Sequence, residues 1–592
     1  MIKRDISHWT ISNSNGKIAL LLFAQSLEEL LAPYSHDSYR VPALNFHYIC
    51  HEIANVIELI EENVLDKGNI IPLLAEMKEL FLHDEIAQSI LGNNFNALFA
   101  KKNAKGEFEQ RPLKIDSSKE VDDALPVLKR GINLILGELN RKDQYYKKLI
   151  ATIKKQISCC NDDLLKLDSL LTLSKIFASE LVNEGYSKYY IYDCVKNKFF
   201  SSDIQITSLD DIDAFFGCFS GEESVYCVYL PLNSLKQKKA IESFGPFKIE
   251  ENIFEMFDVR IPYILRYDCT AYDPYRARED ALQLINFCLS VNQFIKHTNH
   301  DFDSKYADVV DIKTHEVTFI KRPEPLIIRG ASPCESLNVK ELITTCLNLR
   351  GGAFQVLQLH SSALLSKNND NQLINLWTAL EIAVPVNRKD GLSRINQISN
   401  ALTASLSLNY IAILGEQLLL DIKSAAPDAI QLIEKVDYGD EPISKLVALI
   451  VLRKHQQEFD DLLQELIHTA PLLSCRMVRY KNAWSNTKAL KNFYLSHTTR
   501  VSQQIMRIYR TRNMLVHDGS SLPYEDYVLQ NLHYYVDLYV KFLNHSYHQG
   551  YRSISLIIDA AQFQEQLYLD QLSQECELCE ENIPEFIFRG LT

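Results

Sequence analysis

The sequence predicts a mainly helical protein with a mixed α+β middle region and a C-terminal helical bundle. Three observations support this fold class. Glycine and proline are scarce, at 19 and 18 of 592 residues, or about 3% each against typical usages of about 7% and about 5%. Apolar residues recur at helical spacing through most of the chain. Between about residues 203 and 335 that spacing gives way to β-rich runs.

Residues 1–200 are predicted to form a helical N-terminal region. Two segments carry apolar residues three and four positions apart, as one face of a helix requires. They are Ile53, Val56, Ile57 and Ile60, and then Leu164, Leu167, Leu170, Leu171 and Leu173.

Residues 201–335 are predicted to form the mixed α+β region. Residues 225–230, 259–265 and 317–320 are rich in β-branched and aromatic residues, which favours strands. A helix is expected at about 277–296. The proline-containing segment 322–336 is the best candidate for a linker.

Residues 336–560 are predicted to be a second helical domain, and residues 561–592 an acidic C-terminal tail. The clearest helix is expected at about 525–545, because its apolar residues form one stripe. These residues are Val528, Leu532, Tyr535, Val536, Tyr539 and Leu543.

The overall charge and the cysteines limit the class of protein. A net charge of −14 argues against a protein that coats nucleic acid nonspecifically, since such proteins are usually basic. The thirteen cysteines are scattered, and the N-terminus lacks the apolar core of a signal peptide. No run approaches the roughly 20 apolar residues that span a bilayer. We therefore expect a cytoplasmic protein with reduced thiols and no membrane partner.

One segment departs from this acidic average, and we call residues 475–513 the basic segment. It holds nine Lys and Arg residues and no Asp or Glu, so it carries +9 and leaves −23 for the other 553 residues (−14 minus +9). Aromatic residues lie between the cations, which suits single-stranded nucleic acid. The alternative is that the cations pair with acids elsewhere. The candidate RNA-binding residues are Lys488, Lys491, Arg500, Arg507 and Arg510.

The basic segment leads into an arginine and a histidine near a helix end. Arg512 lies in an otherwise apolar stripe, where a charge needs a partner or a cleft. His517 is followed by Asp518 and Gly519, and this glycine is typical of a helix stop. Histidine moves protons near neutral pH, and arginine binds phosphate and stabilises developing charge. Together they suit phosphodiester cleavage without a metal.

Spacing alone leaves a structural role open for this pair. A separation of five residues puts the two side chains roughly 140° apart on an ideal helix. They need not meet within one subunit. Asn513 adds a polar group next to Arg512.

Residues 512–517, Arg-Asn-Met-Leu-Val-His, match the R-x4-H motif of the HEPN superfamily. Residues 373–381, which end in Leu-Trp-Thr-Ala-Leu-Glu, resemble the Trp-containing helix of large bacterial HEPN proteins. The chain is most similar to the ApeA-like HEPN group of anti-phage defence proteins. The resemblance covers about residues 340–550.

This resemblance implies a helical nuclease domain that forms a homodimer, in which two motifs share one cleft. Arg512 and His517 would be catalytic with Asn513 in support, and Glu381 would orient one of them or form a simple salt bridge. The implied activity is metal-independent endoribonuclease cleavage of RNA, with tRNA as the favoured substrate. It would serve antiviral defence by abortive infection, and no cofactor is expected.

The role of the first 335 residues is inferred from size and from the toxicity of a free ribonuclease. We expect them to sense a phage-derived trigger or to restrain the nuclease, with their acids covering the cleft. The alternative function is a non-catalytic RNA-binding or adaptor protein on the same bundle. A metal-dependent hydrolase is the weakest hypothesis, since Asn55 replaces the second histidine of an HExxH zinc motif. Cys576 and Cys579 form a lone CxxC, for which reduced thiols are the better interpretation.

Overall fold

The computed structural model describes most of the chain. The described residues are 4, 6–11, 16–32, 44–92, 95, 100–102, 108–112, 118–141, 144–159, 164–232, 246–251, 263–296, 306–321, 337–366, 368–386, 391–519 and 525–588. The linker expected at 322–336 lies outside them. By compactness the chain divides into two units. The first combines residues 1–180, 205–209 and 329–592, and the second combines residues 181–204 and 210–328.

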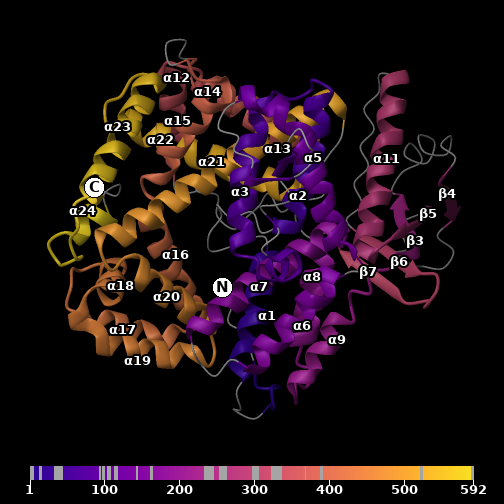
Figure 1. The fold of residues 1–592 in the computed structure, drawn as a ribbon, viewed down its shortest axis with the longest axis horizontal. Coiled ribbons are helices and arrows are strands. Elements are labelled where there is room, and N and C mark those ends of the chain that lie inside the picture. Colours follow the sequence, from indigo (N-terminus) through magenta and orange to yellow (C-terminus); the bar gives the residue numbers. More distant parts are fainter. Residues whose placement is uncertain are drawn as a thin grey trace. The chain divides into compact units, whose positions relative to one another are not determined.

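The predicted fold class is confirmed: the protein is mainly helical, with one five-stranded antiparallel sheet in the middle region and a helical C-terminal part (Figure 1). The N-terminal elements are α1 (Lys17–Leu31), α2 (Phe46–Glu61), α3 (Ile70–Leu82), α4 (Glu85–Leu91), the hairpin β1 (Ala100–Lys102) and β2 (Phe108–Pro112), α5 (Ser118–Leu139), α6 (Gln144–Cys159), α7 (Leu164–Glu184) and α8 (Lys188–Val195).

The second helix of the N-terminal region forms as its apolar spacing predicts. Its first turn is capped by Asn45, whose Oδ1 accepts a hydrogen bond from the Tyr48 amide at 2.9 Å. Ile53, Val56 and Ile57 are fully buried and Ile60 is nearly so. One face of α2 therefore belongs to the core.

The second unit contains the sheet. Besides α8, its elements are α9 (Ile212–Phe216), β3 (Ser224–Leu232), β4 (Lys248–Glu251), β5 (Tyr263–Ala271), α11 (Pro274–Lys296), β6 (Tyr306–Asp311) and β7 (Val317–Lys321). The strand order is β4-β5-β3-β6-β7, and all the pairs are antiparallel. Ala277, Ala281, Ile285 and Leu289, four residues apart on α11, pack on the apolar face of this sheet. Figure 1 shows α11 alongside the strands.

The expected strands correspond to β3, β5 and β7, although residues 259–262 of the second lie outside the described residues. The expected helix at 277–296 is α11. The strands β4 and β6 were not predicted. Both are short, and β6 reads Tyr-Ala-Asp-Val-Val-Asp, without a distinctive alternation.

The remaining elements of the first unit are all helices. They are α12 (Val339–Asn348), α13 (Ala353–Leu365), α14 (Asn369–Ala383), α15 (Arg394–Ser407), α16 (Tyr410–Ala425), α17 (Ile430–Glu434), α18 (Pro442–Val451), α19 (Gln456–Ile467), α20 (Pro471–Ala483), α21 (Thr487–Asp518), α22 (Glu525–His548), α23 (Ile554–Leu572) and α24 (Ile583–Ile587). The six residues of the predicted apolar stripe on α22 are all buried.

Two features of the structure bear on the predicted domain ranges, which remain predictions. Over its described part, the predicted acidic tail 561–592 contains the end of α23, which runs to Leu572, and α24, and Tyr568 donates a hydrogen bond to the Phe586 carbonyl at 2.8 Å. The predicted helical N-terminal region, residues 1–200, shares one compact unit with the C-terminal helices as far as residue 180. Gln25 Nε2, for example, donates to the Thr469 carbonyl at 2.8 Å. Local periodicity carries no information about such distant pairs.

No single helix in the described part of the chain is long and apolar enough to cross a membrane. Together, α15 and α16 reach the necessary length and composition, but they are bent by 50° at their junction.

Candidate functional site

The candidate site lies at the C-terminal end of α21, the longest helix described. Asn486 caps its start by accepting from the Ala489 amide at 2.9 Å. Gly519 ends it with φ 67°, a left-handed conformation that favours glycine, and its amide donates to the Leu515 carbonyl at 3.2 Å. The predicted helix stop is therefore confirmed, and His517 lies in the last turn.

Arg512 and Asn513 form the first part of the site. Asn513 is 6% exposed, and its Oδ1 accepts a hydrogen bond from Arg512 Nη1 at 3.0 Å. Arg512 itself is half-buried, and its Nε is buried without a hydrogen-bond partner among the described residues. The guanidinium is thus fixed on one side, while its buried Nε donor has no hydrogen-bond partner among the described residues in this conformation.

His517 is exposed, as is Val516 beside it. Neither a hydrogen bond nor an ion pair joins it to Arg512 within the described part of the chain. This agrees with the angle of roughly 140° between positions five residues apart. One chain presents the arginine and the histidine on different sides of the same helix end.

The Trp-containing helix α14 packs directly against α21. Trp377 is fully buried, and its ring centroid lies 5.7 Å from that of Tyr509, at an interplanar angle of 48°. Tyr509 precedes Arg512 by three residues, so this ring pair fixes the turn that carries the arginine. The two sequence features that supported the family resemblance therefore meet in space.

The described contacts of Glu381, the last acidic residue of α14, involve Arg394. Its carbonyl accepts from Arg394 Nη2, which also donates to the Val384 carbonyl at 2.6 Å. Burial lowers the pKa of Arg394, and the Glu381 carboxylate acts in the opposite direction. Glu381 therefore acts on Arg394 at the end of α14, and none of its described contacts is to Arg512 or His517.

The basic segment requires a correction. Arg507 and Arg510 were expected to face RNA, but they are 0% and 2% exposed. Arg507 Nε lies 3.1 Å from Glu52 Oε2, and its Nη2 lies 2.6 Å from Glu76 Oε2. Arg510 donates to Glu52 Oε1 from Nε at 3.1 Å and from Nη2 at 2.7 Å. We call these two arginines and two glutamates the buried ion network.

Other cations of the basic segment are also paired. Acidic partners come from the N-terminal helices and from the C-terminal part: Arg476 pairs with Glu29 and Asp421, Arg479 with Asp168, and Lys488 with Glu575. Lys491 donates to Ser573 Oγ at 2.7 Å, and Arg500 donates to the Tyr410 hydroxyl at 3.4 Å. These contacts agree with the alternative interpretation of the basic segment, in which acids elsewhere in the chain neutralise its cations.

The aromatic residues of the basic segment mostly belong to the core. Trp484 and Tyr494 are fully buried, and Tyr480 is 5% exposed. The rings of Tyr480 and Trp484 stack at 4.7 Å. These residues are therefore not available to stack on bases in this conformation.

The two carboxyl groups of the buried ion network titrate differently. Burial raises the pKa of both. For Glu52 the charges of Arg507 and Arg510 outweigh burial and lower the pKa to about 2. For Glu76, burial outweighs the opposing effect of Arg507, and the charge of Glu52 acts in the same direction as burial, so its pKa stays above the ordinary value. Glu52 is the ionised centre of the network.

The apolar neighbours of Glu52 in the sequence indicate that this charge needs a partner, and this indication was missed. On α2, Glu52 lies among Ile49, Ile53 and Val56, all fully buried. A charge within an apolar face needs a partner, which is the argument applied to Arg512. The identity of the partner, more than 450 residues away, could not be read from the sequence.

No cluster of three or more potential metal ligands occurs among the described residues. Cys576 and Cys579 are exposed, and the Cys579 amide donates to Asn582 Oδ1 at 2.8 Å.

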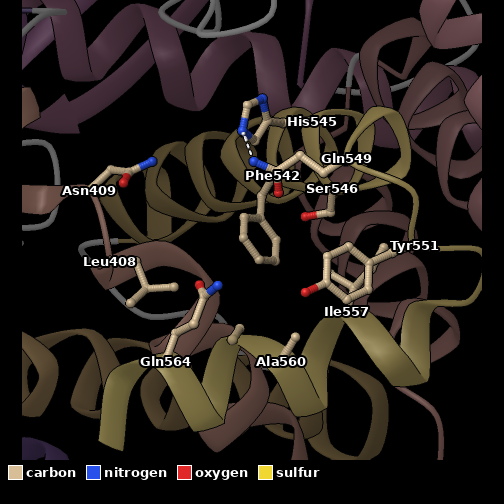
Figure 2. Close-up of a pocket in the computed structure, with 11 residues that line it drawn as sticks. Leu408, Asn409, Phe542, His545, Ser546, Gln549, Tyr551, Ile557, Ala560 and Gln564 are labelled. Atoms are coloured by element: carbon tan, nitrogen blue, oxygen red, sulfur yellow. Dashed lines mark hydrogen bonds between the residues drawn. The ribbon is translucent and has the colours of Figure 1, made fainter. Parts of the chain in front are cut away.

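A pocket of about 160 Å³ lies elsewhere in the first unit, between the ends of α15 and α22 and the side of α23 (Figure 2). Its polar side chains include Asn409, Ser546, Gln549 and Gln564, and Gln549 Nε2 lies 2.8 Å from His545 Nε2. No Lys or Arg lines it, and none of the predicted site residues does. It is therefore poorly suited to bind a phosphate group.

No protein-family model, no curated protein and no solved structure matches the chain.

Proposed function

We propose that the protein is a metal-independent endoribonuclease whose site is formed by Arg512, Asn513 and His517. The observation that carries the proposal is the state of Arg512. Asn513 Oδ1 accepts from Arg512 Nη1 at 3.0 Å, the Trp377–Tyr509 ring pair packs three residues before Arg512 on the same helix, and Arg512 Nε has no hydrogen-bond partner among the described residues. A positioned guanidinium next to an exposed histidine suits phosphodiester chemistry.

The chemistry assigned to these residues is transesterification within RNA. His517 removes the proton from a ribose 2′-hydroxyl, and the resulting oxygen attacks the adjacent phosphorus. Arg512 stabilises the charge that develops on the phosphoryl oxygens. The bond between phosphorus and the 5′-oxygen breaks, and this oxygen takes up a proton from water, so the products are a 2′,3′-cyclic phosphate and a 5′-hydroxyl.

The separation of Arg512 and His517 around the helix favours a homodimer. Each chain would supply one side chain to a shared cleft, so that an arginine from one copy works with a histidine from the other. Resemblance to HEPN proteins supports this arrangement, and it also supports a cytoplasmic role in antiviral defence by abortive infection, with tRNA as substrate and a phage-derived trigger.

The test is cleavage of purified tRNA and mRNA in EDTA by the full-length protein and by Arg512→Ala and His517→Ala. The matched controls are Arg453→Ala and His468→Ala, since Arg453 and His468 are exposed and lie outside the site. We expect EDTA-resistant cleavage that falls at least 100-fold in both site variants and stays unchanged in both controls. Analysis of the RNA ends should show cyclic phosphates.

A non-catalytic RNA-binding or adaptor protein is the second candidate. It is favoured by the lack of any described contact between Arg512 and His517 within one chain. RNA binding by all five proteins without cleavage would support it and contradict the nuclease. Cleavage that EDTA abolishes would instead indicate a metal-dependent hydrolase.

A further inference from the structure

The buried ion network joins α21 to two helices of the N-terminal region. Arg507 and Arg510 lie one turn apart on α21, and both contact Glu52 of α2, while Arg507 also contacts Glu76 of α3. All four residues belong to the same compact unit, and Figure 1 shows α3 close to α21.

The network lies close in sequence to the proposed catalytic residues. Arg510 precedes His517 by seven residues, nearly two helical turns, so the two positions lie on the same face of α21, about 10 Å apart along the axis. Arg512 lies on the opposite side of the helix from Arg510, roughly 160° around the axis. An anion bound between Arg507 and Arg510 would therefore lie on the side of α21 that carries His517.

The geometry of the contacts is that of anion recognition. Both oxygens of Glu52 are used, one on each arginine, and Nε and Nη2 of Arg510 converge on a single oxygen. Arginine makes the same forked hydrogen bonds to phosphate as to carboxylate. Two guanidinium groups one turn apart would hold a phosphate as readily as they hold these carboxylates.

Stability alone does not explain the network. Removing several charged groups from water costs free energy that the ion pairs repay only in part, and apolar residues of similar size often serve equally well. Burial raises the pKa of Glu76, and the charge of the nearby Glu52 raises it further. The arrangement is better suited to carboxylates that another anion can replace than to carboxylates that only fill the core.

We propose that Arg507 and Arg510 form a phosphate-binding site for the RNA backbone and that Glu52 and Glu76 occupy it in place of RNA. This inference rests on the proposed function, which it deepens by assigning the restraint of the nuclease to named residues. In this conformation the carboxylates block the site. RNA gains access when α2 and α3 separate from α21, and the two arginines then contact RNA phosphates on the side of α21 that carries His517.

The first experiment measures RNA binding separately from cleavage. Every protein carries His517→Ala, so that the probes, a single-stranded 20-mer RNA and a tRNA, stay intact. Glu52→Gln/Glu76→Gln is compared with Glu58→Gln/Glu79→Gln, which makes the same charge change at exposed positions of the same two helices. We expect the Kd to fall at least ten-fold in the first variant relative to the control. The slope of log Kd against log salt should steepen by about 1.4, the value for two more phosphate contacts on a single strand.

A third variant tests the arginines. Adding Arg507→Gln and Arg510→Gln to Glu52→Gln/Glu76→Gln should return the Kd to the control value. Equal affinity of the glutamate variant and its control, weaker binding by the glutamate variant, or no RNA binding by any protein would overturn the proposal.

A second measurement avoids the buried substitutions, in case they prevent folding. Hydrogen exchange is followed in the His517→Ala protein with and without a saturating amount of the 20-mer. Exchange in residues 46–61 and 70–82 should rise at least five-fold when RNA is bound, because RNA displaces these helices. Unchanged or slower exchange there would overturn the proposal. Failure of the nuclease proposal is seen separately, as cleavage that does not depend on Arg512 and His517.

Discussion

Glu52 and Arg510 form a buried ion pair between residues 458 positions apart in the chain. Glu52 Oε1 accepts from Arg510 Nη2 at 2.7 Å, and the two residues are 3% and 2% exposed. This pair and the neighbouring Arg507 contacts place an N-terminal helix against the helix that carries the proposed catalytic residues. The N-terminal region is thus part of the immediate environment of the site.

The first prediction concerns the stability of this pair. Arg510→Ala leaves Glu52 buried with one arginine instead of two, and breaking a buried pair in this way costs about 3–5 kcal/mol. Chemical denaturation should show this loss in the free energy of unfolding. Arg453→Ala, which removes an exposed arginine from its pair with Glu577, should cost no more than about 1 kcal/mol. Equal effects of the two substitutions would contradict the buried pair.

The second prediction follows from the pKa of Glu52. Arg507 and Arg510 overcome the effect of burial and lower this pKa from 4.5 to about 2. A carboxyl group whose pKa is lowered by folding stabilises the protein above its unfolded pKa. This contribution, about 3 kcal/mol from the pKa difference, is lost as the pH falls from 4.5 through 2.

The measurement is the free energy of unfolding as a function of pH for the unsubstituted protein, Glu52→Gln and the exposed control Glu58→Gln. Between pH 4.5 and 2, the unsubstituted protein and the control should lose stability more steeply than Glu52→Gln. The difference between these slopes should approach the value for one additional proton bound per molecule in the unfolded state. Identical slopes for all three proteins would show that Glu52 has an ordinary pKa.

The sequence predicts the local structure of this protein well, because local structure depends on near neighbours. The apolar stripes on α2 and α22 and the stop at Gly519 follow from spacing and from the conformational freedom of glycine. Trp377 and Tyr509 are an intermediate case. Trp377 belongs to the Trp-containing helix identified from the sequence, but its contact with Tyr509 at 5.7 Å emerges only when the helices pack.

What the sequence could not predict is the pairing of charges over long distances. Nine cations without an acid nearby look like a nucleic-acid surface, and yet Arg507 and Arg510 are buried against Glu52 and Glu76. A local charge count treats solvent as the default partner of each cation. The partners of Arg507 and Arg510 lie more than 400 positions away in the sequence, so only the folded structure identifies them.

The third prediction concerns the packing of α14 on α21. Trp377 is fully buried against Tyr509, so Trp377→Ala should leave a cavity and cost about 3–5 kcal/mol in the free energy of unfolding. Trp377→Phe keeps an aromatic ring and should cost clearly less. Chemical denaturation followed by circular dichroism measures both. If the two variants were equally stable, the ring contact would have no role in holding the helices together.

The fourth prediction concerns Asn513 as the residue that positions Arg512. Asn513→Ala removes the oxygen that accepts from Arg512 Nη1 at 3.0 Å. A hydrogen bond to a charged group contributes about 1.5–3 kcal/mol, so kcat for RNA cleavage should fall about 10- to 100-fold. KM should change little, because the arginine acts on charge that develops in the transition state.

Two further variants separate positioning from folding. Asn513→Asp keeps an acceptor for Arg512 and should retain most of kcat. If Asn513 acted in folding alone, kcat would not be higher in Asn513→Asp than in Asn513→Ala. Asn482→Ala removes an exposed amide from α20 and should leave kcat unchanged. A loss of kcat in Asn513→Asp as large as in Asn513→Ala would mean that the Asn513 oxygen does not position Arg512. An equal rise of KM in both variants would assign the residue to substrate binding instead.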